Sequence, residues 1–483
     1  MMLNEPLRFS RFTHLFRKDG IVTIFHALKL RTVFFQETLS SLIQEFQYGM
    51  TPDKILAQIG DEEKKESFKQ LISKLERFEI LVPIHYDEMS TLEKIQKNHL
   101  RVSISILYLL LTDKCNFRCD YCFVENAMPA SYKFSQMNQG TTKAALDFFA
   151  ECLTKNPEDF QSKEKTIIFY GGEPLLNKEA FKFALEYIQT LQQNNKLPAK
   201  LKIALNTNGS LIDKEITGLI AQYGVRPSVS LDGPQEIHNK LRKSSFGENT
   251  FEEVIRGYRM LQREKIPVSI SCTIGPHNIQ KLEEIFDWFK DELNVRGLGF
   301  NLFLNAPGVE TNTEYAREAT TKIIRCYEIA RRFGIYEDRI MRKVKAFVER
   351  KPHFIDCGGC GRQIVVSPDG KIGVCHAYTG SKKYFVGDIT KAFNPFTDST
   401  FVEWSKRSPL NMPQCFDCEA LGICGGGCVH NAEINSGSIW TTDRVFCIHS
   451  KEILQWLVWD LYASVARMKG GEKNGKGMVC TQY

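Results

Sequence analysis

Three cysteines that stand close together limit what this chain can fold into. Cys115, Cys119 and Cys122 follow a C-x₃-C-x₂-C spacing. Three thiolates in such a loop can hold a [4Fe–4S] cluster by three of its irons and leave the fourth iron without a protein ligand. A zinc ion or a disulfide pair is the simpler alternative, but a zinc site is usually completed by a fourth Cys or His, and none follows closely. We therefore expect a cluster with one open iron.

The region around this loop predicts an α/β fold. Between residues 102 and about 310, apolar runs alternate with helical stretches, a pattern typical of a parallel sheet built from βαβ units. The first apolar run leads straight into the cysteine loop, so the cluster should lie at the carboxyl end of a strand, where parallel α/β folds build their active sites. Cys152, Cys272 and Cys326 are in phase with apolar residues and are expected in the core. The expected strands are 104–111, 166–170, 201–206, 227–231, 268–273 and 297–303.

Further short motifs follow these strands. Tyr121 precedes the third cysteine, Gly-Gly-Glu-Pro at 171–174 ends the second strand, Asn-Thr-Asn-Gly at 206–209 the third, and Ser-Leu-Asp-Gly-Pro at 230–234 the fourth. With the cysteine loop they resemble the signature of the radical S-adenosylmethionine (radical SAM) enzymes. The resemblance implies a partial (β/α)6 TIM-like barrel. It also implies that the open iron chelates S-adenosyl-L-methionine, whose reductive cleavage yields a 5′-deoxyadenosyl radical that abstracts hydrogen from a substrate.

The same resemblance implies the residues that hold S-adenosylmethionine (SAM). Glu173 and the adjoining backbone would hold the methionine amino group, Ser230 a ribose hydroxyl and Arg242 the carboxylate, while the glycines let the backbone approach the ligand. On its own, Gly-Gly-Glu-Pro is also typical of a tight turn before a helix, and Asp232 is also compatible with a turn cap. The predicted SAM-binding set is Tyr121, Gly171, Gly172, Glu173, Pro174, Asn206, Ser230 and Arg242.

Eight more cysteines lie between residues 357 and 447. Their order resembles the SPASM extension, which holds two auxiliary [4Fe–4S] clusters in radical SAM enzymes that act on peptides and proteins. Eight thiolates complete two Cys₄ sites, so no iron is left open, and closed clusters suit electron transfer. A pair of zinc ribbons is the alternative. The resemblance assigns Cys357, Cys360, Cys375 and Cys428 to the first auxiliary cluster and Cys415, Cys418, Cys424 and Cys447 to the second.

The residue after Cys375 departs from part of the family. Sulfatase-maturating members carry an aspartate base at this position, whereas this chain has His376. Histidine can accept a proton near neutral pH, so His376 is the candidate catalytic base. A hydrogen bond from His376 to a cluster sulfur is the alternative role.

Residues 1–83 are expected to form a small unit of their own. A short hairpin is followed by three helices and a closing strand, which looks like a winged helix. The third helix mixes Lys with Glu and has no basic face, which argues against nucleic acid. In peptide-modifying relatives of radical SAM enzymes a similar domain binds the leader of a precursor peptide as an added strand. DNA binding or a purely structural cap are the alternatives.

Composition adds limits on partners and location. Apolar residues make up 43% and charged residues 25% of the 483 residues, as in ordinary globular proteins. No apolar run is long enough to span a membrane, and the N-terminus lacks the pattern of a signal peptide, so we expect a cytoplasmic protein without membrane contact. After the winged-helix-like unit we expect a linker at 84–100, a radical SAM core at 101–310, a helical connection at 311–350, a SPASM domain at 351–450, and a C-terminal helix with a flexible tail at 451–483.

These observations lead to one functional hypothesis and two alternatives. The hypothesis is a radical SAM oxidoreductase with three [4Fe–4S] clusters that forms a thioether or C–C crosslink in a precursor peptide or small client protein, with flavodoxin or ferredoxin as electron donor. The first alternative is an enzyme that oxidises a Cys or Ser of a client protein to formylglycine. The second is a non-catalytic Fe–S or leader-binding regulator.

Overall fold

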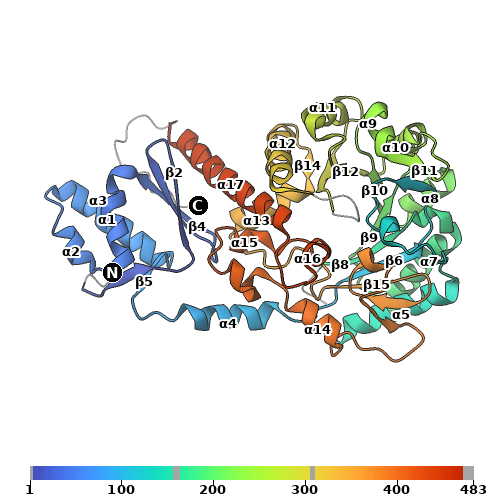
Figure 1. Ribbon diagram of the computed structural model, residues 1–483, viewed down its shortest axis with the longest axis horizontal. Helices are drawn as coiled ribbons and strands as arrows, with labels where there is room; N and C mark the ends of the chain where they lie inside the picture. The colour runs from blue at the N-terminus through green and yellow to red at the C-terminus, as the bar shows by residue number, and fades with distance from the viewer. Residues whose placement is uncertain (1–3, 156–163, 305–310, 471–483) are drawn as a thin grey trace.

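The computed structural model describes residues 4–155, 164–304 and 311–470, apart from the side chains of 468–470 (Figure 1). Its centre is a ten-stranded, mostly parallel sheet of order β14-β13-β12-β10-β9-β8-β6-β15-β16-β17. The six strands expected from the sequence lie in the middle of this sheet, and each pairs in parallel with the next. They are β6 (Ile106–Thr112), β8 (Lys165–Gly171), β9 (Leu201–Thr207), β10 (Arg226–Ser230), β12 (Ser269–Ile274) and β13 (Gly297–Leu302).

Among the described residues, five helices of nine or more residues connect these strands and cover one face of the sheet (Figure 1). Along β9, β10, β12 and β13, fully buried apolar side chains alternate with half-buried, mostly small or polar ones. The apolar side chains pack under the helices, and Cys152, Cys272 and Cys326 lie in this core as expected. The other face is therefore unusually polar for a sheet interior, with Asn206, Ser230, Ser271 and Asn301. The helices are α5 (Gln139–Thr154), α7 (Lys178–Gln193), α8 (Lys214–Gln222), α10 (Phe251–Arg263) and α11 (Leu282–Asp291).

The sheet continues beyond the six expected strands on both sides. On one side β14 (Tyr336–Glu337) pairs with β13 between the two helices of the expected connection, α12 (Thr313–Arg332) and α13 (Asp338–Glu349). On the other side β15 (Gln363–Val366) pairs in parallel with β6. The cysteine-rich segment thus supplies a strand to the core sheet, because the edge of β6 otherwise leaves its backbone groups unpaired. The antiparallel strands β16 (Lys371–Gly373) and β17 (Phe385–Asp388) complete this side.

Residues 7–81 contain a small core of their own, with the expected hairpin and three helices. The hairpin strands β3 (Ile21–His26) and β4 (Arg31–Gln36) are joined by a third strand, β2 (Thr13–Lys18), in the order β2-β3-β4. Gly49 ends the first helical stretch in the left-handed conformation. Whether this unit is a true winged helix stays a prediction. Its remaining elements are α1 (Ser40–Gln44), α2 (Pro52–Leu56), α3 (Glu62–Arg77) and the paired strands β1 (Leu7–Phe9) and β5 (Leu81–Pro83).

Two helices tie the N-terminal unit to the rest of the chain (Figure 1). The expected linker is mostly a helix, α4 (Glu88–His99), whose buried Glu88 accepts a hydrogen bond from Arg8 Nη1 at 2.7 Å. The C-terminal helix α17 (Arg444–Gly470) begins earlier than expected and packs along α12. Its Tyr462 ring lies 5.3 Å from the Phe34 ring of β4. The expected flexible tail after 470 lies outside the described residues.

Within the described ranges, no helix has the length and hydrophobicity required to cross a bilayer.

Candidate active site

The cysteine loop leaves the carboxyl end of β6 and is fixed by a small sheet of its own. Strand β7 (Phe117–Cys119) pairs in antiparallel fashion with β11 (Arg242–Ser244), which places Cys119 opposite Arg242. The chain then turns back on itself, and the N–H of Cys122 donates a hydrogen bond to the carbonyl of Cys119 at 3.0 Å. The spacing of the three cysteines therefore corresponds to a strand followed by one tight turn.

Several N–H groups point at the sulfur atoms of this loop. The backbone N–H of Phe117 lies 3.4 Å from Cys115 Sγ and that of Glu125 3.4 Å from Cys122 Sγ. Arg242 Nη1 lies 3.8 Å from Cys119 Sγ. Burial raises the pKa of Cys119 to about 12 and raises that of the other two thiols as well. Because thiols must be deprotonated to bind a metal, donors to sulfur stabilise the form that a cluster requires, and the loop fits a [4Fe–4S] cluster.

The Gly-Gly-Glu-Pro segment packs against the backbone that leads into this loop. Gly171 has a positive φ of 142°, and a Cβ there would lie 2.0 Å from the carbonyl oxygen of Thr112. A Cβ on Gly172 would lie 2.1 Å from the carbonyl oxygen of Lys114. The neighbouring main chain therefore requires glycine at both positions, and their predicted contact with SAM stays a prediction. The glycines thus allow β8 to hold the start of the cysteine loop in position.

Glu173 is fully buried and joins the ends of two strands. Its carboxylate accepts hydrogen bonds from Thr207 Oγ1 at 2.8 Å, from the N–H of Asn208 at 2.7 Å and from the N–H of Leu175 at 3.1 Å. Burial raises the pKa of this carboxyl to about 7. Both carboxylate oxygens therefore already have partners. Its predicted contact with the amino group of SAM stays a prediction.

Arg242 belongs to a buried charged cluster that sequence reasoning found only in part. Its Nε donates to Asp232 Oδ2 at 2.9 Å, and Tyr121 donates its hydroxyl to the same oxygen. Burial alone would raise the pKa of Asp232, but the charge of Arg242 holds it well below its ordinary value. Asp232 Oδ1 accepts from the N–H of Thr273 on the next strand, at 3.0 Å. Asp232 thus joins neighbouring strands from a buried position and is not merely a turn cap. The ring of His277 stacks on that of Tyr121 beside it.

The guanidinium of Arg242 retains an unused donor. Nε binds Asp232, and Nη1 faces Cys119. Nη2 makes no hydrogen bond with any residue in the described ranges. The group also lies 5.2 Å above the ring of Tyr121. An arginine fixed in this way beside a cluster cysteine is compatible with its predicted role as a ligand for the SAM carboxylate.

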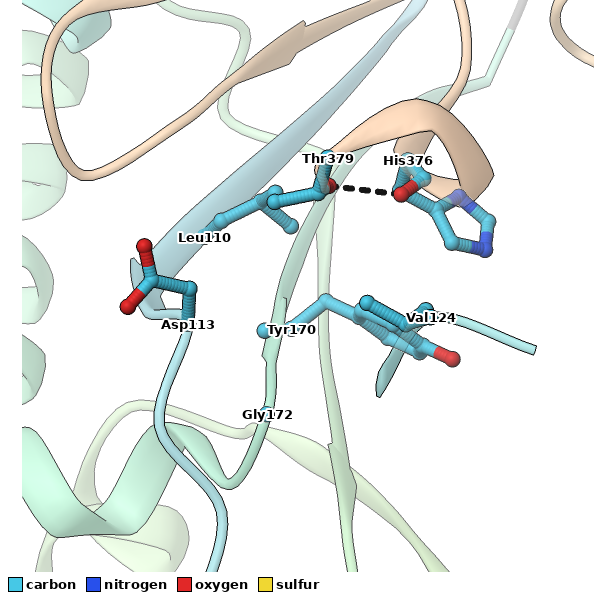
Figure 2. A pocket seen from close by; sticks show the side chains of 8 residues that line it. Leu110, Asp113, Val124, Tyr170, Gly172, His376 and Thr379 are labelled. Atoms are coloured by element: carbon cyan, nitrogen blue, oxygen red, sulfur yellow. Dashed lines mark hydrogen bonds between the residues drawn. The ribbon is translucent and has the colours of Figure 1, made fainter. Parts of the chain in front are cut away.

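His376 lines a narrow pocket between the sheet and the cysteine-rich segment (Figure 2). Its ring centre lies 4.8 Å from that of Tyr108 and 4.7 Å from that of Tyr170. Burial, together with the charge of His430, lowers the pKa of His376 to about 4, so the ring is neutral at neutral pH. Its Nδ1 is buried and has no partner among the described residues. The pocket is lined by Leu110, Asp113, Val124, Tyr170, Gly171, Gly172, His376 and Thr379.

The eight cysteines of the second region lie in two groups in the fold. In the first group, Cys360 donates a hydrogen bond that holds the pKa of Cys357 below its ordinary value, and the charge of Cys357 acts on Cys375 and Cys428. In the second group, burial raises the pKa of Cys447 to about 12, and the charges of Cys424, Cys415 and Cys418 raise it further. The groups contain the same cysteines as the two predicted sets.

Four cysteines in each group could serve a Cys₄ cluster or a zinc site. Among the residues that the structure describes, no three His, Cys, Asp or Glu side chains converge on a single-ion site. Zinc would need its sulfur ligands at about 2.3 Å from one point. A [4Fe–4S] cluster attaches each cysteine to a different iron and so needs a wider arrangement. The donor set is that of two Cys₄ sites, and the assignment of clusters to them stays a prediction.

Comparison with known families identifies the central part of the chain. The model of the radical SAM superfamily matches residues 109–289, which include the cysteine loop and the ends of β8, β9 and β10. The chain contains a radical SAM domain.

Two curated proteins are similar to this chain over two thirds of its length or more. A radical SAM cyclopropyl synthase of Paramaledivibacter caminithermalis is 25% identical over 74% of each chain. A cysteine-type anaerobic sulfatase-maturating enzyme of Clostridium perfringens is 24% identical over 67% of this chain and 88% of its own.

Two solved structures share the fold. That of anSMEcpe with bound AdoMet covers 75% of this chain and all of its own, with a TM-score of 0.63 and 22% identity. That of Streptococcus suis SuiB with bound S-adenosylmethionine covers 91% of this chain and 99% of its own, with a TM-score of 0.52 and 16% identity.

Sequence reasoning missed several residues of the radical SAM domain that shape this site. Asp232 and His277 are buried beside Arg242 and Tyr121. Tyr108 and Tyr170 were assigned only to strands, yet their rings lie against His376. The signal that could have found them is the phase of the strands, because both tyrosines alternate with buried apolar residues and so belong to the polar face.

Proposed function

We propose that this protein is a cytoplasmic radical SAM oxidoreductase that matures a precursor peptide or a small client protein. Cys115, Cys119 and Cys122 would hold the [4Fe–4S] cluster that binds SAM. The two cysteine groups of the second region would hold two closed auxiliary clusters. When bound, these groups supply a hydrogen-abstracting 5′-deoxyadenosyl radical on one side of the pocket and an electron acceptor on the other.

One observation carries this proposal: the pocket at His376 lies between the two kinds of cysteine site. Burial raises the pKa of the Tyr170 hydroxyl, and negative charge on Cys122 and on Cys375 raises it further. Burial also raises the pKa of Tyr108 on the neighbouring strand, and negative charge on Cys357 and on Cys375 raises it further. A substrate residue in this pocket would thus be within reach of the SAM-binding cluster and of the first auxiliary cluster. Electrons released by the substrate would have a nearby destination.

The reaction we propose is a crosslink, either a thioether or a C–C bond. One hydrogen atom of the substrate would be transferred to the 5′-deoxyadenosyl radical, which gives 5′-deoxyadenosine, and bond formation by the substrate radical would then release one proton and one electron, the electron to an auxiliary cluster. His376 is the proposed proton acceptor because it lines the pocket and its buried Nδ1 has no partner among the described residues. The similarity to a cyclopropyl synthase, whose name denotes a new carbon ring, favours bond formation on carbon.

The N-terminal unit is the proposed leader-binding domain. Its sheet has the order β2-β3-β4 and so offers β2 and β4 as edge strands to which an extended peptide can add. A peptide client is also supported by anSMEcpe, whose structure with bound AdoMet and the Cp18Cys peptide has a TM-score of 0.61 and 22% identity. Flavodoxin or ferredoxin is the proposed electron donor.

Formylglycine formation is the second candidate. The sulfatase-maturating relative in Clostridium perfringens favours it, whereas His376 in place of the aspartate base speaks against it. Such an enzyme would leave an aldehyde in its product and no new linkage.

Mass spectrometry of candidate peptides incubated with the reconstituted enzyme, SAM and a reductant would decide between the candidates. A crosslinked peptide loses two hydrogens, does not react with hydrazine reagents and resists fragmentation between the linked residues. A product that hydrazine labels would establish formylglycine formation. Absence of 5′-deoxyadenosine would contradict both and leave the non-catalytic regulator.

A further inference from the structure

A short glycine run connects the two cysteine groups of the second region. Helix α15 (Leu421–Cys424) ends at a cysteine of the second group, and α16 (Val429–Ser436) starts after Cys428 of the first. Residues 425–427 between them are all glycine, with φ values of 74°, 90° and 69°. Three successive positive φ values are accessible almost only to glycine. The chain therefore crosses from one group to the other by a sharp, closely packed turn.

Arg407 is buried directly against this turn. Its side chain is 0% exposed. Nη1 donates to the carbonyl of Gly426, the middle glycine, at 2.9 Å, Nη2 donates to that of Thr441 at 3.0 Å, and Nε to that of Ile439. A Cβ on Gly426 would lie 3.3 Å from Nη1, so glycine at this position also lets the guanidinium approach.

The positive charge of Arg407 has no carboxylate partner. Three of its acceptors are backbone carbonyls and one is the side chain of Cys360, and it forms no ion pair with a carboxylate among the described residues. Burial raises the pKa of the Asp443 carboxyl, and the charge of Arg407 lowers it only in part. The oxygens of Asp443 accept hydrogen bonds from the N–H groups of Cys428 and Phe446 and none from Arg407. A fully buried, unpaired charge is costly in a folded protein. The position calls for a negative group that the polypeptide itself does not supply.

The cysteines around Arg407 identify that group. The turn that Arg407 holds through its hydrogen bond to Gly426 runs from Cys424 of the second group to Cys428 of the first. Four thiolates around a [4Fe–4S] core give each closed cluster a net negative charge, and cluster potentials depend on nearby charge and hydrogen bonds. We propose that Arg407 is the shared counter-ion of the two auxiliary clusters and raises the reduction potential of both. This inference rests on the proposed function, because it requires both clusters.

A redox titration tests this directly. We would use the full-length chain with Cys119→Ala, so that only auxiliary clusters contribute, and follow reduction by EPR. Arg407→Met removes the charge and Arg407→Lys retains it. The control is Arg331→Met, which removes a partly exposed arginine that pairs with Asp460.

The expected result is a shift of both clusters in Arg407→Met alone. At a fixed potential, the ratio of reduced to oxidised cluster should fall at least tenfold, which corresponds to about 59 mV for one electron. Arg407→Lys and Arg331→Met should stay within about threefold of the parent.

Four outcomes would overturn the inference. Unchanged potentials in iron-loaded Arg407→Met overturn it outright, and a shift of one cluster alone overturns the shared role. If Arg407→Met fails to hold auxiliary iron, a tenfold shift in Arg407→Lys overturns the role of the charge. If the parent itself lacks auxiliary iron, the three-cluster part of the proposed function fails first and this inference fails with it.

Discussion

Removing the Asp232 carboxylate should destabilise the radical SAM domain more than any surface ion pair can. Asp232→Ala leaves the Nε of Arg242 without its acceptor at 2.9 Å and deprives the Tyr121 hydroxyl of the same partner. The Asp232 side chain is 0% and that of Arg242 9% exposed, so water does not replace the lost contacts. Breaking a buried ion pair by removing one partner costs about 3–5 kcal/mol. We expect a loss of stability in this range.

A matched control separates burial from charge. Asp460 accepts two hydrogen bonds from Arg331, both at 2.8 Å, near the surface. Asp460→Ala should therefore cost only about 0.2–1 kcal/mol. Anaerobic urea unfolding of the metal-free proteins, followed by circular dichroism, measures both changes. If Asp232→Ala loses no more stability than Asp460→Ala, our account of this cluster as the anchor of the cysteine loop is wrong.

Three further predictions concern the loop, the N-terminal unit and the chemistry. Gly172→Ala should lower iron loading of the radical SAM site, because the added Cβ would meet the Lys114 carbonyl oxygen at 2.1 Å. The control Gly218→Ala should leave iron loading unchanged, because nothing lies within 4 Å of its added Cβ. Iron analysis of both variants checks this. Burial lowers the pKa of His26 from 6.5 to about 4. The free energy of unfolding therefore keeps its full value above pH 6.5 and decreases, by roughly 3 kcal/mol at most, as the pH falls toward 4. His26→Gln should flatten this part of the pH profile of the melting temperature, and an unchanged profile would contradict the assignment. Cys119→Ala should abolish formation of 5′-deoxyadenosine yet retain auxiliary iron, and retained cleavage of SAM would refute the cluster assignment.

Most of the fold could be predicted because its signals are local. The six central strands are short apolar runs, and so are the two strands of the hairpin in the N-terminal unit. The two cysteine groups were predicted from spacing and resemblance, and their assignment to two clusters stays a prediction. Strand β15 was missed because its four residues gain their role only from the unpaired edge of β6, which the sequence does not display.

The residues that complete the site were harder to predict because their roles depend on distant partners. Asp232 follows a strand as many turn residues do, and only the fold shows that Arg242 and Thr273 both reach it. Arg407 stands in the polar run Ser-Lys-Arg-Ser, which is typical of a surface, yet it is fully buried. The start of α17 was placed too late because Cys447 and its neighbours interrupt the apolar pattern of the helix.

Iron and sulfide analysis of the anaerobically reconstituted protein, with EPR spectra recorded with and without SAM, tests the central claim most directly. Our account predicts about twelve irons per chain and one cluster signal, that of the site at Cys115, Cys119 and Cys122, which changes when SAM is added. About four irons, with zinc bound by the second cysteine region, would contradict it.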